Sequence, residues 1–83
     1  MSHEDLQAVA RKDPFKPFRV ILTTGATYDI RHPDLIMIGR RSAVIGFAKD
    51  EGGTIYDRAT WVDLLHIVGV EELPVKSSGN GEI

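Results

Sequence analysis

Apolar and polar residues alternate along two runs that flank a glycine, at residues 18–23 and 28–31. A period of two residues is typical of strands that bury one face. Gly25 lies between the runs and readily adopts the positive φ of a tight turn. The pattern predicts a β-hairpin that ends before Pro33, because proline cannot donate a hydrogen bond to a central ladder.

A short amphipathic helix is predicted over residues 2–12, where Leu6 and Ala10 lie one turn apart on an apolar stripe. Ser2 stands at a suitable N-cap position. Pro14 ends the pattern, because the residue before a proline is disfavoured in the helical region. Since so narrow a stripe does not stabilise an isolated helix, we expect the helix to pack on the sheet.

The rest of the chain predicts further strands, separated by a turn at Gly39–Arg41, a loop at Asp50–Gly53 and a break near Leu65 and His66. These strands cover residues 35–38, 42–49, 54–64 with a bulge, and 67–70. The predicted fold class is mostly β (α+β), with an N-terminal helix followed by a strongly bent antiparallel sheet of about five strands. We expect the sheet to curl towards a small barrel, because closure removes exposed strand edges.

The chain of 83 residues is long enough for one small domain, and the apolar pattern places it at residues 1–74. Residues 75–83 are predicted to form a flexible C-terminal tail, because Ser, Gly and Asn replace the apolar pattern there. No internal repeat is visible in the sequence. The expected organisation is therefore a single helix-plus-sheet domain followed by a tail.

Composition narrows the class of protein further. Hydrophobic residues make up 42% of the chain and charged residues 27%, which is close to ordinary globular usage. The chain has no cysteine, which excludes disulfides, thiol catalysis and cysteine-based metal sites. No apolar run approaches the ~18 to 20 residues of a membrane span, and residues 1–11 lack the apolar centre of a secretory signal. We therefore expect a cytoplasmic protein without a membrane partner.

Basic side chains offer a candidate surface for nucleic acid or another partner, and Tyr28, Phe47 or Trp61 would supply rings on which bases stack. The net charge of −2 opposes a strongly electrostatic nucleic-acid binder, and arginines at alternate strand positions are also typical of a solvated face. Both interpretations stay open at this point. The predicted basic rim consists of Arg31, His32, Arg40, Arg41 and His66.

The sequence supports a catalytic or metal site less well than it supports a binding surface. His32 and His66, with Asp34 and Asp63 nearby in sequence, are suitable metal-ligand types, but no His-x3-His spacing connects them. A histidine beside a proline more simply bonds the local backbone. We predict no catalytic residue, cofactor or metal, and a small enzyme or metal protein centred on the two histidines stays as an alternative.

Two apolar runs, at residues 35–38 and 64–68, place hydrophobic side chains on both faces of their strands. That is more apolar surface than the interior of one small barrel needs. Self-association, by strand addition or through an apolar patch, would bury the excess. The alternative is that the helix covers the second face. We therefore predict a non-enzymatic binding or assembly module whose partner is another copy or another protein.

Four short motifs resemble a family of short uncharacterised bacterial proteins. They are Pro-Phe-Lys-Pro-Phe at 14–18, Thr-Thr-Gly at 23–25, Arg-His-Pro at 31–33 and Asp-Leu-Leu-His-Ile at 63–67. The resemblance covers residues 13–73. It implies a shared fold and no mechanism.

The chain also resembles Sm-like small barrels, in which a short helix precedes five bent strands and a glycine follows the first strand, as Gly25 does here. Bacterial Sm-like RNA chaperones carry a Lys-His pair before the last strand, and Leu65-His66 stands at that place. Their Asp-x-x-x-Asn signature aligns Asp34 with Asp and Ile38 with Asn. The resemblance implies an Sm-like barrel with RNA as a ligand, although this chain lacks the Lys and the Asn.

Overall fold

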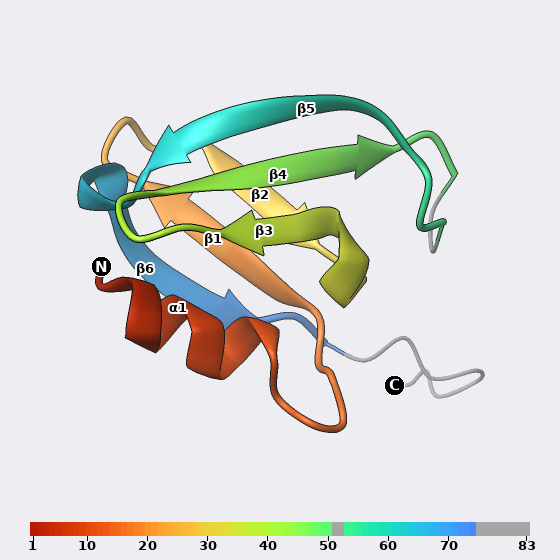
Figure 1. Ribbon diagram of the computed structural model, residues 1–83, viewed down its shortest axis with the longest axis horizontal. Coiled ribbons are helices and arrows are strands. Elements are labelled where there is room, and N and C mark those ends of the chain that lie inside the picture. Colours follow the sequence, from red (N-terminus) through yellow and green to blue (C-terminus); the bar gives the residue numbers. More distant parts are fainter. Residues whose placement is uncertain (51–52, 75–83) are drawn as a thin grey trace.

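The computed structural model describes residues 1–50 and 53–74, which leaves the predicted tail at 75–83 outside the described residues. In this part of the chain one N-terminal helix precedes six antiparallel strands, and two 3₁₀ turns interrupt the strand sequence (Figure 1). A mostly β fold with an N-terminal helix is therefore confirmed. The elements are α1 (His3–Ala10), β1 (Phe18–Leu22), β2 (Thr27–Ile30), η1 (Pro33–Leu35), β3 (Ile36–Ile38), β4 (Ser42–Ala48), β5 (Tyr56–Asp63), η2 (Leu64–His66) and β6 (Ile67–Glu72).

The strands form two three-stranded sheets with the orders β2-β1-β6 and β3-β4-β5. The turn η1 carries the chain from the first sheet to the second, and η2 carries it back (Figure 1). The inward side chains of both sheets meet in one core. Its strand residues are fully or almost fully buried and comprise Phe18, Val20, Ile30, Ile36, Ala43, Ile45, Val62 and Ile67.

The predicted hairpin is confirmed in β1 and β2. Gly25 has a φ of 91°, and its N–H donates to the carbonyl of Leu22 over 2.9 Å. The Leu22 N–H in turn donates to the carbonyl of Ala26 over 2.9 Å. A side chain at position 25 would be strained in this conformation, which explains why the turn contains glycine.

The predicted helix is confirmed at α1, and the hydroxyl of Ser2 accepts the Asp5 N–H over 3.1 Å as an N-cap. Leu6 and Ala10 are fully buried in the core, so the helix does pack on the sheets. The helix ends at Ala10, two residues earlier than predicted. Beyond it, Lys12 pairs with Glu72 of β6 at 3.3 Å.

The guanidinium of Arg11 anchors the end of α1 to η1 and to β3, the first strand of the β3-β4-β5 sheet. It donates to the carbonyls of Pro33 over 3.2 Å and Ile36 over 3.0 Å. In the described residues, no helix has the length and apolar content needed to cross a bilayer.

Several predicted strand limits are wrong by a few residues. The strand predicted at 35–38 is shortened, because Leu35 belongs to η1. The strand predicted from residue 54 begins at Tyr56, and the last strand continues to Glu72. The bulge in the long strand lies near Tyr56, where the register with β4 shifts.

The described residues also show no closed barrel. The sequence favoured about five strands in one curling sheet, whereas six strands form two separate ladders. Pro33 has no N–H to donate and starts a 3₁₀ turn, so β2 and β3 do not continue as one strand. Because the two sheets do not join into a barrel, β5, a strand of eight residues, lies at the edge of its sheet.

Candidate functional site

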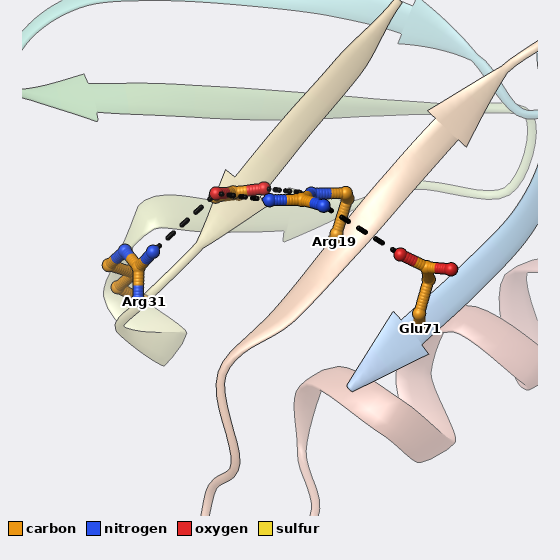
Figure 2. Close-up of polar contacts among 4 residues, drawn as sticks. Arg19, Arg31 and Glu71 are labelled. Atoms are coloured by element: carbon orange, nitrogen blue, oxygen red, sulfur yellow. Dashed lines mark hydrogen bonds and ion pairs between the residues drawn. The ribbon is translucent and has the colours of Figure 1, made fainter. Parts of the chain in front are cut away.

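The outer face of the β2-β1-β6 sheet carries charges that pair with one another (Figure 2). Arg19 on the central strand stands in register with Asp29 on one side and Glu71 on the other. Its guanidinium donates to both Asp29 carboxylate oxygens, over 2.7 and 3.2 Å. Glu71 lies 3.8 Å from Arg19, and Arg31 lies 3.5 Å from Asp29.

Ionisation of this face follows from the same contacts. The hydrogen bond from Arg19, with that cation's charge, holds the pKa of Asp29 below its ordinary value. The hydrogen bond to Asp29 raises the pKa of Arg19. Two cations and two anions therefore neutralise one another across three strands.

The outer face of the β3-β4-β5 sheet is different in character. Val44 on the central strand stands in register with Met37 on one side and Trp61 on the other. Met37 is 65% exposed and Trp61 is 75% exposed. Two pairs further along and on the same face, Gly46 is in register with Ala59. We call this surface the apolar face, and its residues are Met37, Val44, Gly46, Tyr56, Ala59 and Trp61.

A depression lies on the apolar face beside Gly46. A Cβ at position 46 would come within 2.9 Å of the Tyr56 Cβ and 3.5 Å of a Leu35 methyl, so the glycine leaves room for both neighbours. The space has a volume of about 100 Å³. We call it the Gly46 depression, and it is lined by Asp34, Leu35, Ile36, Met37, Val44, Gly46, Tyr56 and Ala59.

The five residues of the predicted basic rim lie in two groups at opposite ends of β3. Arg31 and His32 precede η1, where Arg31 pairs with Asp29. Arg40 and Arg41 are exposed in the turn after β3. The Arg41 carbonyl accepts the Leu64 N–H over 2.9 Å, which places this turn beside η2 and therefore near His66.

The histidines are likewise separated between the two 3₁₀ turns. His32 Nδ1 accepts the Asp34 N–H over 3.1 Å, so this ring bonds the local backbone, as its position beside Pro33 predicted. His66 ends η2, where Asp63 caps the turn by accepting the Leu65 N–H over 2.9 Å. In residues 1–50 and 53–74, no three His, Asp or Glu side chains are grouped in a way that could hold a metal ion.

Near η2 a second, open depression of about 260 Å³ combines aromatic and polar side chains. Its volume is larger than that of the Gly46 depression, but its lining is more mixed. It lies between the β1–β2 hairpin and the end of β5, and it is lined by Leu22, Thr23, Thr24, Tyr28, Trp61, Val62, Asp63 and His66.

The two apolar runs predicted surplus apolar surface, but the sequence did not show which of their side chains are exposed. Of the two apolar runs, Ile36 and Leu64 are buried, whereas Met37, Leu65 and Val68 are exposed. The helix does not cover Met37, Leu65 or Val68, so the alternative of a helix-covered second face is wrong for these three residues. Trp61 was predicted only as a ring for base stacking, and the signal for its place on the outer face was its alternation with buried Val62 along one strand.

Comparison of the chain with protein-family models, with curated proteins and with solved structures finds no match. The functional argument therefore rests on the described surfaces themselves. Of these, the apolar face is the one that water solvates least well.

Proposed function

We propose that this protein is a non-enzymatic assembly module that associates with itself through the apolar face. The observation that carries the proposal is the row Met37, Val44 and Trp61, which is in register across three strands and in which Met37 and Trp61 are largely exposed. Burial of apolar surface contributes about 25 cal/mol for each Å² removed from water. Large aromatic side chains gain most from such burial, and tryptophan is enriched at the energetic centres of interfaces.

The contrast between the two outer faces supports this choice of surface. On the β2-β1-β6 sheet, Arg19, Asp29 and Glu71 satisfy one another and expose charge to water. The apolar face has no charged member among its six residues. A monomer that used neither face would solvate the first readily and the second poorly, so a partner belongs on the second.

The proposal also includes an Sm-like arrangement of the strands. The strands β2 and β3 belong to separate ladders joined by η1, and an Sm-like count of strands takes β2, η1 and β3 together as a single bent segment. With that reading the domain has five bent strands after a helix and a 3₁₀ turn before the last strand, an Sm-like arrangement. The exposed edge of β5 would then offer strand addition as a second mode of assembly.

The proposal is tested by the mass of the protein in solution, measured by sedimentation and light scattering over a wide concentration range. We expect assemblies larger than the 9.2 kDa monomer at high concentration. The chain contains one tryptophan, so its emission should shift to shorter wavelength as assembly buries Trp61. A strictly monomeric protein with unchanged emission at every concentration would contradict self-assembly.

Nucleic acid is the competing ligand, because Arg40 and Arg41 lie beside η2, and His66 lines the depression that also contains Trp61. The competing case is resolved by adding short single-stranded RNA to the dilute protein at low and at moderate salt. Affinity that falls steeply with salt would favour the nucleic-acid function. No binding at either salt leaves the assembly function in place.

A further inference from the structure

We infer that two copies of the chain pair edge to edge through β5, with the two strands antiparallel about a two-fold axis at Trp61. This pairing rests on the proposed function, which is self-assembly, and gives it a strand, a register and an axis. Three properties of the edge carry it: its open hydrogen-bonding groups, the irregularities at its two ends and the charges along it.

The open side of β5 follows from one hydrogen bond. Within the described residues β5 pairs only with β4, and Figure 1 shows it along the upper border of the molecule. The Leu64 N–H donates to the carbonyl of Arg41 over 2.9 Å, which makes these two residues a hydrogen-bonded pair of the ladder. Since such pairs alternate with pairs that are not hydrogen-bonded, every second residue of β5 directs its main-chain groups away from β4. The residues with groups on the open side are Ala59, Trp61 and Asp63.

The open groups of the edge are both donors and acceptors. Within residues 1–50 and 53–74, no main-chain hydrogen bond outside the ladders involves the N–H of Ala59, Trp61 or Asp63. Asp63 is the N-cap of η2, so its carbonyl closes the first turn of that helix. The N–H groups of all three residues and the carbonyls of Ala59 and Trp61 therefore stay open. A row of such groups is a template for an added strand.

A second copy supplies a matching edge, because its β5 presents the same open groups in the same order. A two-fold axis perpendicular to the sheet makes the two strands antiparallel. With the axis at Trp61, the two Trp61 residues exchange a pair of main-chain hydrogen bonds. The Asp63 N–H of each copy then donates to the Ala59 carbonyl of the other. This register uses every open group except the Ala59 N–H.

Charge and regularity select this register over its neighbours. An axis at Thr60 would place Asp63 of each copy opposite Asp57 of the other, and like charges directly opposite one another are destabilising. An axis nearer Tyr56 would bring the bulge of β5 into the contact, where the ladder is irregular. With the axis at Trp61, Asp63 lies opposite an alanine and the bulge lies outside the contact.

The features that blunt an edge strand stand at the two ends of β5. Charged side chains and bulges oppose strand addition. Asp57 and Arg58 follow the bulge at one end, and Asp63 precedes η2 at the other. Arg58 lies over the Phe47 ring of its own copy, 4.7 Å from the ring centre. Residues 59–62 carry no charge, so the centre of the edge is open and the contact is short.

Trp61 is the side chain that gains most from this pairing. It is 75% exposed, and the axis sets the two Trp61 side chains next to each other on the outer face. Aromatic pairs across neighbouring strands are stabilising. A contact through one short strand belongs with small interfaces, which bury less than about 1,200 Å² in total. We therefore expect a dimer that dissociates on dilution.

The first experiment uses the fact that a residue on a two-fold axis faces its own copy. Trp61→Lys and Trp61→Glu each oppose like charges, and each alone should dimerise at least about tenfold more weakly than the wild type. Their mixture opposes unlike charges and should form a heterodimer, which native mass spectrometry resolves when one variant is labelled with heavy nitrogen. The matched control is Met37→Lys, an exposed position of the same outer face on β3, which should pair through β5 like the wild type.

The second experiment determines the register by disulfide formation, since the chain has no cysteine of its own. In the expected register Ala59 of one copy lies opposite Asp63 of the other, with Cα atoms about 5.5 Å apart, which a disulfide can span. With oxidised glutathione, Ala59→Cys mixed with Asp63→Cys should give a mixed disulfide dimer, whereas neither variant alone should cross-link. Thr60→Cys is the matched control, because an axis at Thr60 would cross-link it to itself.

The outcomes separate this arrangement from the proposed function. A heterodimer of the charge variants, together with the mixed disulfide, supports the pairing at Trp61. If the charge variants associate no better in the mixture than alone, or if Ala59→Cys or Thr60→Cys cross-links to itself as readily as the mixture does, the arrangement is overturned while self-assembly of the wild type stands. A wild type that stays monomeric at all concentrations overturns both. Circular dichroism of each variant verifies that the chain is folded.

Discussion

Asp29 lies at the centre of the ion pairs on the β2-β1-β6 sheet and accepts two hydrogen bonds from Arg19. The folded pKa of Asp29 is lower than its ordinary value of 3.8, chiefly because of the hydrogen bond from Arg19. A carboxyl with a depressed folded pKa stabilises the protein above its unfolded pKa, and this stability is lost as the pH falls through the folded pKa. The stabilising effect of Asp29 is therefore complete near neutral pH and disappears in acid.

We expect Asp29→Asn to lower the free energy of unfolding by about 1 kcal/mol at neutral pH, because a partly exposed ion pair contributes no more than that. The difference between wild type and variant should shrink as the pH falls below about 4, where the wild-type carboxylate takes up a proton. Urea unfolding at several pH values measures both quantities. Asp50→Asn is the control, because Asp50 is exposed, and a difference of constant size at all pH values would contradict the prediction.

Gly25 is the residue that the hairpin turn constrains most, since its φ is 91°. An added Cβ would meet nothing within 4 Å, so Gly25→Ala should lose stability through backbone strain alone, by about 1 to 2 kcal/mol. Gly69→Ala is the matched control, because its added Cβ would have only an ordinary contact, 3.8 Å from Ile21. Alanine there should be neutral or stabilising by up to about 1 kcal/mol in thermal unfolding. Equal losses at both positions would contradict the role of positive φ.

At the scale of elements, α1 is held by packing and not by its own helical stability. It has eight residues, which is too short for a stable isolated helix in water. Leu6 is fully buried in the core that both sheets share. The helix therefore exists because the sheets provide a surface for Leu6 and Ala10.

We expect Leu6→Ala to destabilise the protein by about 2 to 5 kcal/mol, because the cavity would lie in the core. The midpoint of urea unfolding measures this loss. Gln7→Ala, on the exposed side of the same helix, should change the stability by less than about 0.5 kcal/mol. A Leu6→Ala effect as small as that of the control would show that the helix is dispensable for the core.

The individual elements also show which structural features a local sequence pattern predicts and which it does not. The β1–β2 hairpin and the N-cap at Ser2 were predictable, because both depend on residues within a few positions of one another. The apolar run at 35–38 was predicted as one strand, yet His32 and Pro33 turn its start into a 3₁₀ turn. A run of four apolar residues is too short to show a period that would distinguish a 3₁₀ turn from a strand.

At the scale of the whole molecule, the two outer faces differ because different strands meet there. Arg19, Asp29 and Glu71 come from three strands that the chain enters at residues 18, 27 and 67. Met37 and Trp61 are 24 positions apart in the chain and share a face only because β4 lies between β3 and β5. The basic rim was predicted as one surface, but β3 separates its residues into two groups.

Local periodicity, glycine and proline were enough to predict the helix, the hairpin, the mostly β class and the surplus of apolar side chains. Three features became visible in the folded protein alone: the strands form two sheets, the charges of one outer face neutralise one another, and Trp61 and the Gly46 depression share the other outer face. Strand pairing and burial depend on segments far apart in the chain, and no local pattern specifies the register between such segments.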